Sequence, residues 1–238
     1  MTPLSDIDLV ALATGCEAGP PVDAALRALA LAWPDVPPAR WPALDAGRRD
    51  ALLLQLRRRH FGDWLHAESV CPACGERLEF ELSATALIGA QPAVDPAHDG
   101  PPLAVRLQGQ SRQLRRPSTA DLLAARDATD LARRCALEAP AGDLAWCSDP
   151  AWLQAFGEAL AADAPLADAQ LALVCPACSS SWEETLDAAV FLVQDLQAAG
   201  RRLLDEVHVL ALAYHWSERD ILALPAERRR HYLGRLTS

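Results

Sequence analysis

The 238-residue sequence contains neither lysine nor asparagine, so every basic residue other than histidine is arginine. We attribute this bias to GC-rich codon usage and infer nothing about function from it. Acidic residues are in excess, with 32 aspartates and glutamates against 22 arginines, which gives a formal net charge of −10. Such a charge repels a phosphate backbone, so nucleic acid is not expected to be the main partner.

The sequence also lacks a long hydrophobic run. Its longest apolar stretches, residues 28–33 and 207–214, fall well short of the roughly 20 residues that a membrane span requires. The start of the chain leads into the acidic segment 5–8 rather than into a basic leader, so no signal peptide is visible. Because 51% of the residues are apolar, a packed core can form. We therefore expect a globular protein of the cytoplasm that has no membrane partner.

Sequence motifs of several enzyme classes are missing. The chain has no phosphate-binding Walker loop, no G-x-G-x-x-G, no G-x-S-x-G and no H-E-x-x-H. We accordingly expect a protein that is not an enzyme and that has no small-molecule substrate.

The seven cysteines include two copies of one motif, Cys-Pro-Ala-Cys, whose first cysteines are 104 residues apart. A C-x-x-C turn lets two sulfur atoms face one point, and Zn²⁺ in a closed structural site takes four ligands at tetrahedral corners. Two such turns, here called knuckles, supply one complete shell without an open position for water or substrate. We predict one structural Zn²⁺ per chain, bound by the four knuckle cysteines: Cys71, Cys74, Cys175 and Cys178.

Three alternatives for the knuckles remain open. A lone C-P-x-C also resembles a redox turn of the thioredoxin type, although neither copy is followed by a helix-start signal. The knuckles could be unrelated structural cysteines, and His66, five residues before Cys71, could compete as a ligand. The other cysteines have no partner at a useful spacing and are interpreted as small buried residues: Cys16, Cys135 and Cys147.

The residues around the two knuckles match each other. Val70 and the strand-like segment 78–82 flank the first knuckle, and segments 173–174 and 182–186 flank the second. Gly75 supplies the positive φ that the turn after a knuckle often needs, and serines fill the equivalent place in the second copy. The pattern predicts the two halves of a zinc ribbon, separated by a large insertion.

Helical patterns dominate the rest of the chain. They predict helices over residues 6–14, 23–33 and 46–61, and a long helix over 187–216 that could break near Gly200. Shorter helices are expected from Ser83, Ser217 and Pro225, with a break at residues 140–142. Alternating residues predict a hairpin from strands at 103–107 and 112–115, with a turn at 109–110.

These patterns together predict an α+β fold, mostly helical, with a small antiparallel sheet built around the split zinc ribbon. We expect one integrated globular unit with three regions. They are an N-terminal helical region (1–66), a zinc-ribbon and sheet region (67–186) with a helical insertion (about 117–162), and a C-terminal helical region (187–238).

The C-terminal stretch 206–225 reads EVHVLALAYHWSERDILALP and is followed by RRHYL at 229–233. It resembles the small proteins of contractile phage tails, prophages and tail-like injection systems that are described as T4-type baseplate hub assembly proteins or chaperones. Other matching features are segment 47–54 leading to Phe61 and Gly62, the two knuckles, and segment 117–122. Together they span most of the chain. The second knuckle departs slightly, with Ser179 where the first has Gly75.

The resemblance implies a non-enzymatic assembly factor, or a minor structural component, of a contractile-tail baseplate or hub. Its partners would be baseplate or hub proteins, and it would act in the cytoplasm or stay in the assembled particle. The alternative is a zinc-ribbon protein that acts in regulation or on nucleic acid. Such a protein needs a basic, aromatic face on the ribbon. The residues beside the knuckles are instead acidic: Glu76, Glu79, Glu81, Glu183 and Glu184.

The segment from about residue 203 to 236 carries more apolar and aromatic groups than one helical stripe can bury. Tryptophan, tyrosine and arginine concentrate binding energy at interfaces, and helices can dock through such spacings. With the resemblance, this predicts a partner-binding surface composed of Tyr214, Trp216, Arg228, Arg229, Arg230 and Tyr232. The alternative is that these residues pack on the zinc-linked core.

Overall fold

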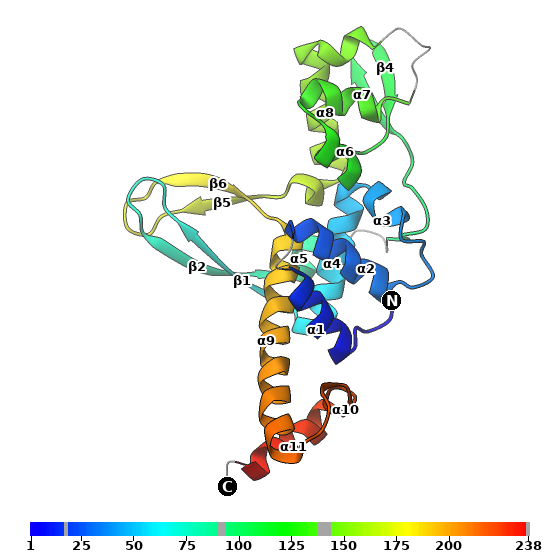
Figure 1. The fold of residues 1–238 in the computed structure, drawn as a ribbon. Coiled ribbons are helices and arrows are strands. Elements are labelled where there is room, and N and C mark those ends of the chain that lie inside the picture. Colours follow the sequence, from blue (N-terminus) through cyan, green and yellow to red (C-terminus); the bar gives the residue numbers. More distant parts are fainter. Residues whose placement is uncertain (17–18, 90–93, 138–143, 237–238) are drawn as a thin grey trace. The chain divides into compact units, whose positions relative to one another are not determined.

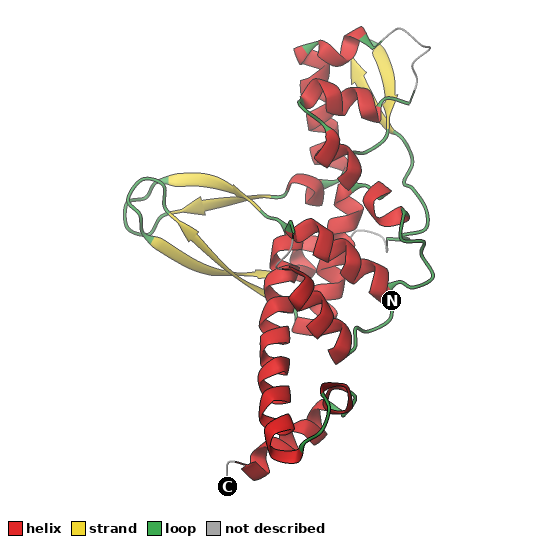
Figure 2. Cartoon of the chain, viewed as in Figure 1, coloured by secondary structure: helices red, strands yellow, loops and turns green. Residues whose placement is uncertain are grey.

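The structure of the chain is a computed structural model that describes residues 1–16, 19–89, 94–137 and 144–236. It has an α+β fold that is mostly helical, and its described strands form three separate two-stranded antiparallel sheets (Figure 2). The expected α+β class, mostly helical with antiparallel strand pairing, is thereby confirmed, but the described strands form three small sheets where one was expected. Within the described residues no helix is both long and apolar enough to cross a membrane. The break expected at residues 140–142 lies outside the described residues.

Figure 1 labels most of the elements, which follow in chain order. They are α1 (Asp6–Gly15), α2 (Pro21–Ala32), α3 (Arg40–Ala43), α4 (Ala46–Phe61), β1 (Trp64–Val70), β2 (Arg77–Ser83), α5 (Ala84–Ile88), β3 (Leu103–Leu107), β4 (Gln110–Leu114), α6 (Thr119–Ala124), α7 (Ala128–Cys135), η2 (Ala145–Ser148), α8 (Pro150–Asp163), η3 (Pro165–Asp168), β5 (Gln170–Val174), β6 (Ser181–Thr185), α9 (Ala188–Tyr214), α10 (Glu218–Leu222) and α11 (Ala226–Leu236).

Two compact units divide the chain. Unit 1 consists of Met1–Asp35, Leu56–Gly62 and Ala188–Ser238, and unit 2 consists of Val36–Gln55 and Asp63–Asp187. The helix α4 therefore contributes residues to both units. This grouping differs from the three consecutive regions expected from the sequence, because the first and last regions both contribute helices to unit 1.

Unit 1 is built on the long helix α9, against which α1, α2, α10 and α11 pack. This helix continues through Gly200, so the break considered at that residue does not occur. A Cβ added at Gly200 would lie 2.2 Å from the Cβ of Ala13 in α1, which is too close for any side chain. The glycine is therefore explained by the close approach of two helices and not by an interruption of one.

A buried arginine connects three helices of unit 1. Arg229 in α11 is 2% exposed, and its Nη1 lies 2.6 Å from Asp6 Oδ2 at the start of α1. Its Nε donates to Glu206 Oε2 in α9 at 2.7 Å, and Nη1 also donates to the Leu224 carbonyl oxygen at 2.7 Å. A buried charge persists only with such partners. Arg229 thus holds α11 against α1 and α9.

In unit 2, the β3–β4 hairpin shares an apolar core with α7, η2 and α8. The buried members of this core are Leu103, Val105, Leu114, Ala132, Cys135, Trp146, Cys147, Trp152 and Phe156. The guanidinium of Arg112 lies 5.7 Å from the Trp146 ring centroid and 5.9 Å from that of Trp152, which is cation–π geometry. Cys135 and Cys147 are buried here, and Cys16 is buried in unit 1, as expected for these three cysteines.

Candidate metal centre

Two β-hairpins of unit 2 carry the two knuckles at their tips. The β1–β2 hairpin is paired from Trp64↔Ser83 to Val70↔Arg77, and the β5–β6 hairpin from Gln170↔Thr185 to Val174↔Ser181. The last pair of each ladder therefore stands directly beside its knuckle. Figure 1 shows the two hairpins running side by side to a shared end, where the two loops meet.

The backbone of the second knuckle repeats that of the first. The Cys71 N–H donates to the Glu76 carbonyl oxygen at 2.8 Å, and the Cys175 N–H donates to that of Ser180 at 2.9 Å. The N–H groups of Gly75 and Ser179 donate back to the carbonyl oxygens of Cys71 and Cys175, at 2.9 and 3.0 Å. The sequence match between the knuckles therefore corresponds to one loop structure used twice.

The two loops bring the four predicted ligands together. The Sγ atoms of Cys71, Cys74, Cys175 and Cys178 all lie within 4.8 Å of one another. Across the two loops, Cys71 Sγ is 3.7 Å from Cys178 Sγ, and Cys74 Sγ is 3.6 Å from Cys175 Sγ. These separations exclude disulfides, whose sulfur atoms are about 2.05 Å apart. A tetrahedral site with metal–sulfur distances of about 2.3 Å has sulfur–sulfur edges of about 3.8 Å, close to the two separations across the loops.

Burial of the four cysteines is unequal. The first cysteine of each knuckle, Cys71 or Cys175, is buried, and the second, Cys74 or Cys178, is exposed. The cluster therefore lies at the surface of the hairpin tips, with two sulfurs turned toward the protein and two toward solvent. This arrangement is compatible with a metal site that can be loaded and chelated from solution.

Backbone N–H groups favour a thiolate at Cys71. Burial raises the pKa of the Cys71 thiol, but N–H groups of Cys74 and Ala73 donate to its sulfur and neighbouring thiols add to them, which lowers the pKa to about 7. At Cys74 the Glu76 N–H lowers the pKa of the thiol. The sulfurs of Cys178 and Cys175 raise it by more than that, so the pKa of Cys74 is about 12. One thiolate thus makes the next harder to form. A divalent cation would replace the retained protons.

A side-chain hydrogen bond connects the two hairpins near the cluster. Ser69 in β1 is buried, and its hydroxyl donates to the Glu184 carboxylate in β6. Strand β1 was not predicted, because beside the first knuckle the pattern indicated a strand only after it. Its signal was the alternation of inward Leu65, Ala67 and Ser69 with outward residues. This signal is weak because two of the three inward residues are small and the outward residues include Trp64 and Val70.

His66 lies away from the cysteines. Its side chain is exposed on β1, where Nδ1 is 3.1 Å from Glu81 Oε1 on the paired strand β2. Within the described residues, the group of side chains that could hold a metal consists of the four cysteines. The histidine considered as a competing ligand is therefore placed in a cross-strand pair.

The predicted partner-binding residues separate into three groups in unit 1. Tyr214, Trp216 and Tyr232 form a half-buried ring cluster with centroid distances of 4.8, 4.9 and 5.5 Å. Arg228 and Arg230 are exposed on α11. Arg229, between them, is buried in its ion pairs and is not available to a partner. Sequence alone did not show which of the three consecutive arginines is buried. Their side chains point in different directions around the helix, and the direction that faces the other helices depends on the fold.

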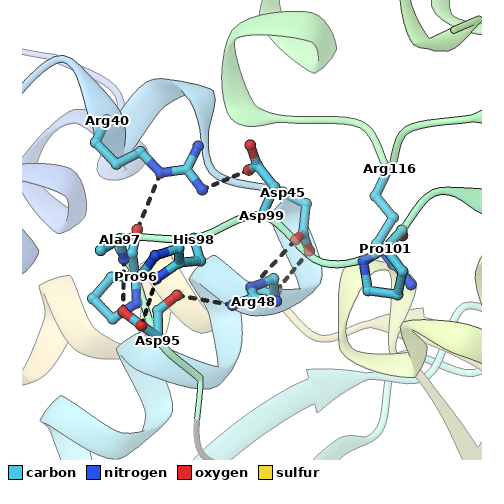
Figure 3. Close-up of polar contacts among 10 residues, drawn as sticks. All are labelled: Arg40, Asp45, Arg48, Asp95, Pro96, Ala97, His98, Asp99, Pro101 and Arg116. Carbon is cyan, nitrogen blue, oxygen red and sulfur yellow. Dashed lines mark hydrogen bonds and ion pairs between the residues drawn. The ribbon is translucent and has the colours of Figure 1, made fainter.

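A second polar cluster in unit 2 was not predicted. Three arginines donate to carbonyl oxygens of segment 95–101: Arg48 to Asp95 at 2.8 Å, Arg40 to Pro96 at 3.0 Å and Arg116 to Pro101 at 2.6 Å (Figure 3). The same guanidiniums pair with the carboxylates of Asp45, Asp99 and Asp163. A cavity of about 550 Å³ lies beside Arg40 and Arg116. Because these arginines hold protein groups, we assign them to fixing the loop.

In comparisons with known proteins, no protein-family model, no curated protein and no solved structure matches the chain.

Proposed function

We propose that the four-cysteine cluster binds one structural Zn²⁺. The donor set supports this assignment, because four thiolates suit Zn²⁺ better than hard cations such as Ca²⁺ or Mg²⁺. The sulfur separations of 3.6 and 3.7 Å also fit a tetrahedral shell. Cys71, Cys74, Cys175 and Cys178 would hold the ion, which would link the tips of two hairpins far apart in sequence. Four protein ligands leave no position for substrate, so its role would be structural.

We further propose that the chain is a non-enzymatic assembly factor, or a minor structural component, of a contractile-tail baseplate or hub. The resemblance of segment 206–225 and of the other matching segments to the T4-type baseplate hub assembly family supports this proposal. Its expected site of action is the cytoplasm in which tails assemble.

The surface proposed for a baseplate or hub partner is the ring cluster with its exposed arginine neighbours. Tyr214 stacks on Trp216, and Tyr232 contacts both rings edge-on, at centroid distances of 4.8 to 5.5 Å; the three side chains remain half-buried. Arg228 and Arg230 place two cationic side chains on the same helix as Tyr232. Aromatic groups beside arginine are typical of residues that dominate binding energy.

The decisive experiment is affinity purification of the tagged chain from cells that express its native gene cluster. We expect baseplate or hub proteins to co-purify, and Arg228→Glu combined with Arg230→Glu to reduce their recovery at least about tenfold without changing the melting temperature. Arg219→Glu, another exposed arginine, provides the control. Recovery of no tail protein by the wild type, or equal recovery by the double variant, contradicts the function or the surface respectively.

The alternative of a nucleic-acid-associated zinc ribbon is separable by charge. The two knuckle hairpins, residues 64–83 and 170–185, contain six glutamates and one arginine, a side-chain charge of −5. We expect DNA and RNA binding weaker than the usual non-specific range of about 10⁻⁴ to 10⁻⁶ M at physiological salt. A salt-sensitive gel shift below 1 μM would favour the alternative.

A further inference from the structure

The two knuckles together expose an apolar surface that the proposed metal role does not use. Val70 and Val174 occupy equivalent positions, each directly before the first cysteine of its knuckle, and are 56% and 63% exposed. The proline and alanine inside each knuckle are also exposed. We define this knuckle tip by its six residues: Val70, Pro72, Ala73, Val174, Pro176 and Ala177.

The outward direction of the two valines follows from strand alternation. In β1, buried Leu65 and Ser69 alternate with exposed Trp64, His66, Glu68 and Val70. In β5, Val174 lies on the exposed side with Gln170 and Ala172. A threonine would suit the strand equally well and would be better hydrated. Strand propensity therefore explains a β-branched residue at both positions, but not an apolar one.

The two hairpins that carry the knuckle tip are negatively charged. Between Val70 and Gly75, and between Val174 and Ser181, the chain contains no charged side chain apart from the cysteines. Six glutamates lie on the hairpin strands and turns, and the one arginine of the hairpins, Arg77, donates to Glu68 at 3.1 Å. Four thiolates around a divalent ion would add a net charge of −2. The tip is thus apolar at its end and acidic on its sides.

We propose that the knuckle tip inserts into an apolar hollow, rimmed by arginine or lysine, on a partner protein. The apolar end would be covered by the hollow, and the glutamates would meet the basic rim. A second copy of this chain is disfavoured as occupant because two acidic tips repel each other, and DNA, RNA and anionic membranes are disfavoured by the same charge. The inference rests on the proposed metal only in that the ion would hold both loops at one tip.

The first experiment is site-specific photocrosslinking of the full-length chain in cells that express its gene cluster. A benzophenone amino acid replaces Val174 in one variant and Leu123 in the control. Leu123 lies on α6 of the same unit and is 67% exposed, so it matches Val174 in exposure. We expect a crosslinked protein from position 174 and not from position 123, and we expect its crosslinked segment, mapped by mass spectrometry, to combine apolar with basic residues.

The second experiment uses the crosslinked protein, purified, as the binding probe. Val70→Thr combined with Val174→Thr keeps the β-branched shape but hydrates the tip, and we expect it to weaken binding at least about tenfold while metal content stays unchanged. Leu123→Thr is the control and is expected to bind within twofold of wild type. Raising the salt from about 0.05 to 0.5 M should also weaken wild-type binding, because the charges of the rim are screened.

Several outcomes would overturn the inference. They are equal crosslinking from positions 123 and 174, no crosslinking from either, a second copy as the crosslinked protein, an acidic crosslinked segment, or unchanged binding by the double threonine variant. If position 174 crosslinks a partner but no tail protein co-purifies with the wild type, the proposed function fails and the tip inference stands. If tail proteins co-purify with the wild type but position 174 yields no crosslink, the reverse holds.

Discussion

Ser179 occupies in the second knuckle the backbone position that Gly75 occupies in the first, and both have a positive φ, +59° and +77° respectively. Each residue donates its N–H to the carbonyl oxygen of the first cysteine four positions earlier. A side chain is unfavourable at positive φ, so the second knuckle contains backbone strain that the first avoids.

This relationship predicts opposite effects of two substitutions. Gly75→Ala should lower the free energy of unfolding by about 1 kcal/mol, since a Cβ there meets no atom within 4 Å and only the backbone conformation opposes it. Ser179→Gly should raise it by up to about 1 kcal/mol, and Ser179→Ala should leave it nearly unchanged. Urea unfolding of the metal-loaded proteins measures all three. A neutral Gly75→Ala would show that the positive φ is not required.

Metal content and stability should fall together when one ligand is removed. Cys74→Ser and Cys178→Ser are the clearest variants, because both side chains are exposed and their replacement costs little packing. We expect each variant to lose its metal and several kcal/mol of unfolding free energy, as structural zinc sites couple binding to folding. Elemental analysis and thermal melts measure the two effects. Cys16→Ala, which changes a cysteine of unit 1, should keep the metal.

Wild-type protein that stays folded at the same melting temperature after complete chelation would contradict the structural role of the ion. Chelation of a redox dithiol would leave the fold intact, so the same melt also separates the zinc interpretation from the thioredoxin-type alternative.

Arg229 should behave unlike its two neighbours. Arg229→Ala leaves Asp6 and Glu206 without their partner in a partly buried place, and we expect a loss of about 2–4 kcal/mol in unfolding free energy. Arg228→Ala and Arg230→Ala change exposed side chains and should stay within about 0.5 kcal/mol of wild type. Urea unfolding measures all three variants. Equal effects at the three positions would contradict the buried ion pairs. Because Arg229 is needed for folding, a loss of partner binding in an Arg229 variant would report unfolding and not a lost contact with the partner.

Asp121 should make part of the stability pH-dependent. The Arg115 guanidinium beside it outweighs its burial and, with Ser118, holds the pKa of this carboxyl well below its usual range. Because the pKa is lowered, the contribution of the Asp121 carboxylate to folding stability is complete above the ordinary aspartate pKa of about 3.9. That contribution is lost as the pH falls below this value. Asp121→Asn should therefore cost about 1–2 kcal/mol at pH 7, and the difference from wild type should narrow at pH 3.

Urea unfolding of both proteins at the two pH values tests this, and any metal loss at pH 3 affects both alike. Asp149→Asn is the matched control, because Asp149 also caps a helix but asparagine caps equally well. A difference for Asp121→Asn that stays constant between pH 7 and pH 3 would contradict the lowered pKa.

Much of the fold could be predicted because its signals are local. The helix predicted over residues 46–61 coincides with α4, and the strand predicted over 103–107 coincides with β3. Local signals also act at α6, where Ser118 forms a capping box with Asp121. The turn of the β3–β4 hairpin lies one residue earlier than predicted, at Gln108 and Gly109, because both have positive φ.

The candidate site was predictable for a related reason. Two knuckles with ligand spacing specify four sulfurs whatever lies between them, and the structure brings those four together. What could not be predicted depends on neighbours distant in sequence. Gly200 suggests a break until Ala13 is seen against it, and Arg229 looks exposed until Asp6 and Glu206 are placed beside it.

The distance between the two knuckles also sets an order of events during synthesis. Cys175 follows Cys71 by 104 residues. At a translation rate of about 5–20 residues per second, the second pair of thiols is therefore synthesised roughly 5–20 s after the first. During that interval the β3–β4 hairpin and α6 to α8 can fold without the four-sulfur cluster. The cluster closes only after Cys178 has left the ribosome, which makes its closure a marker that the intervening segment has been completed.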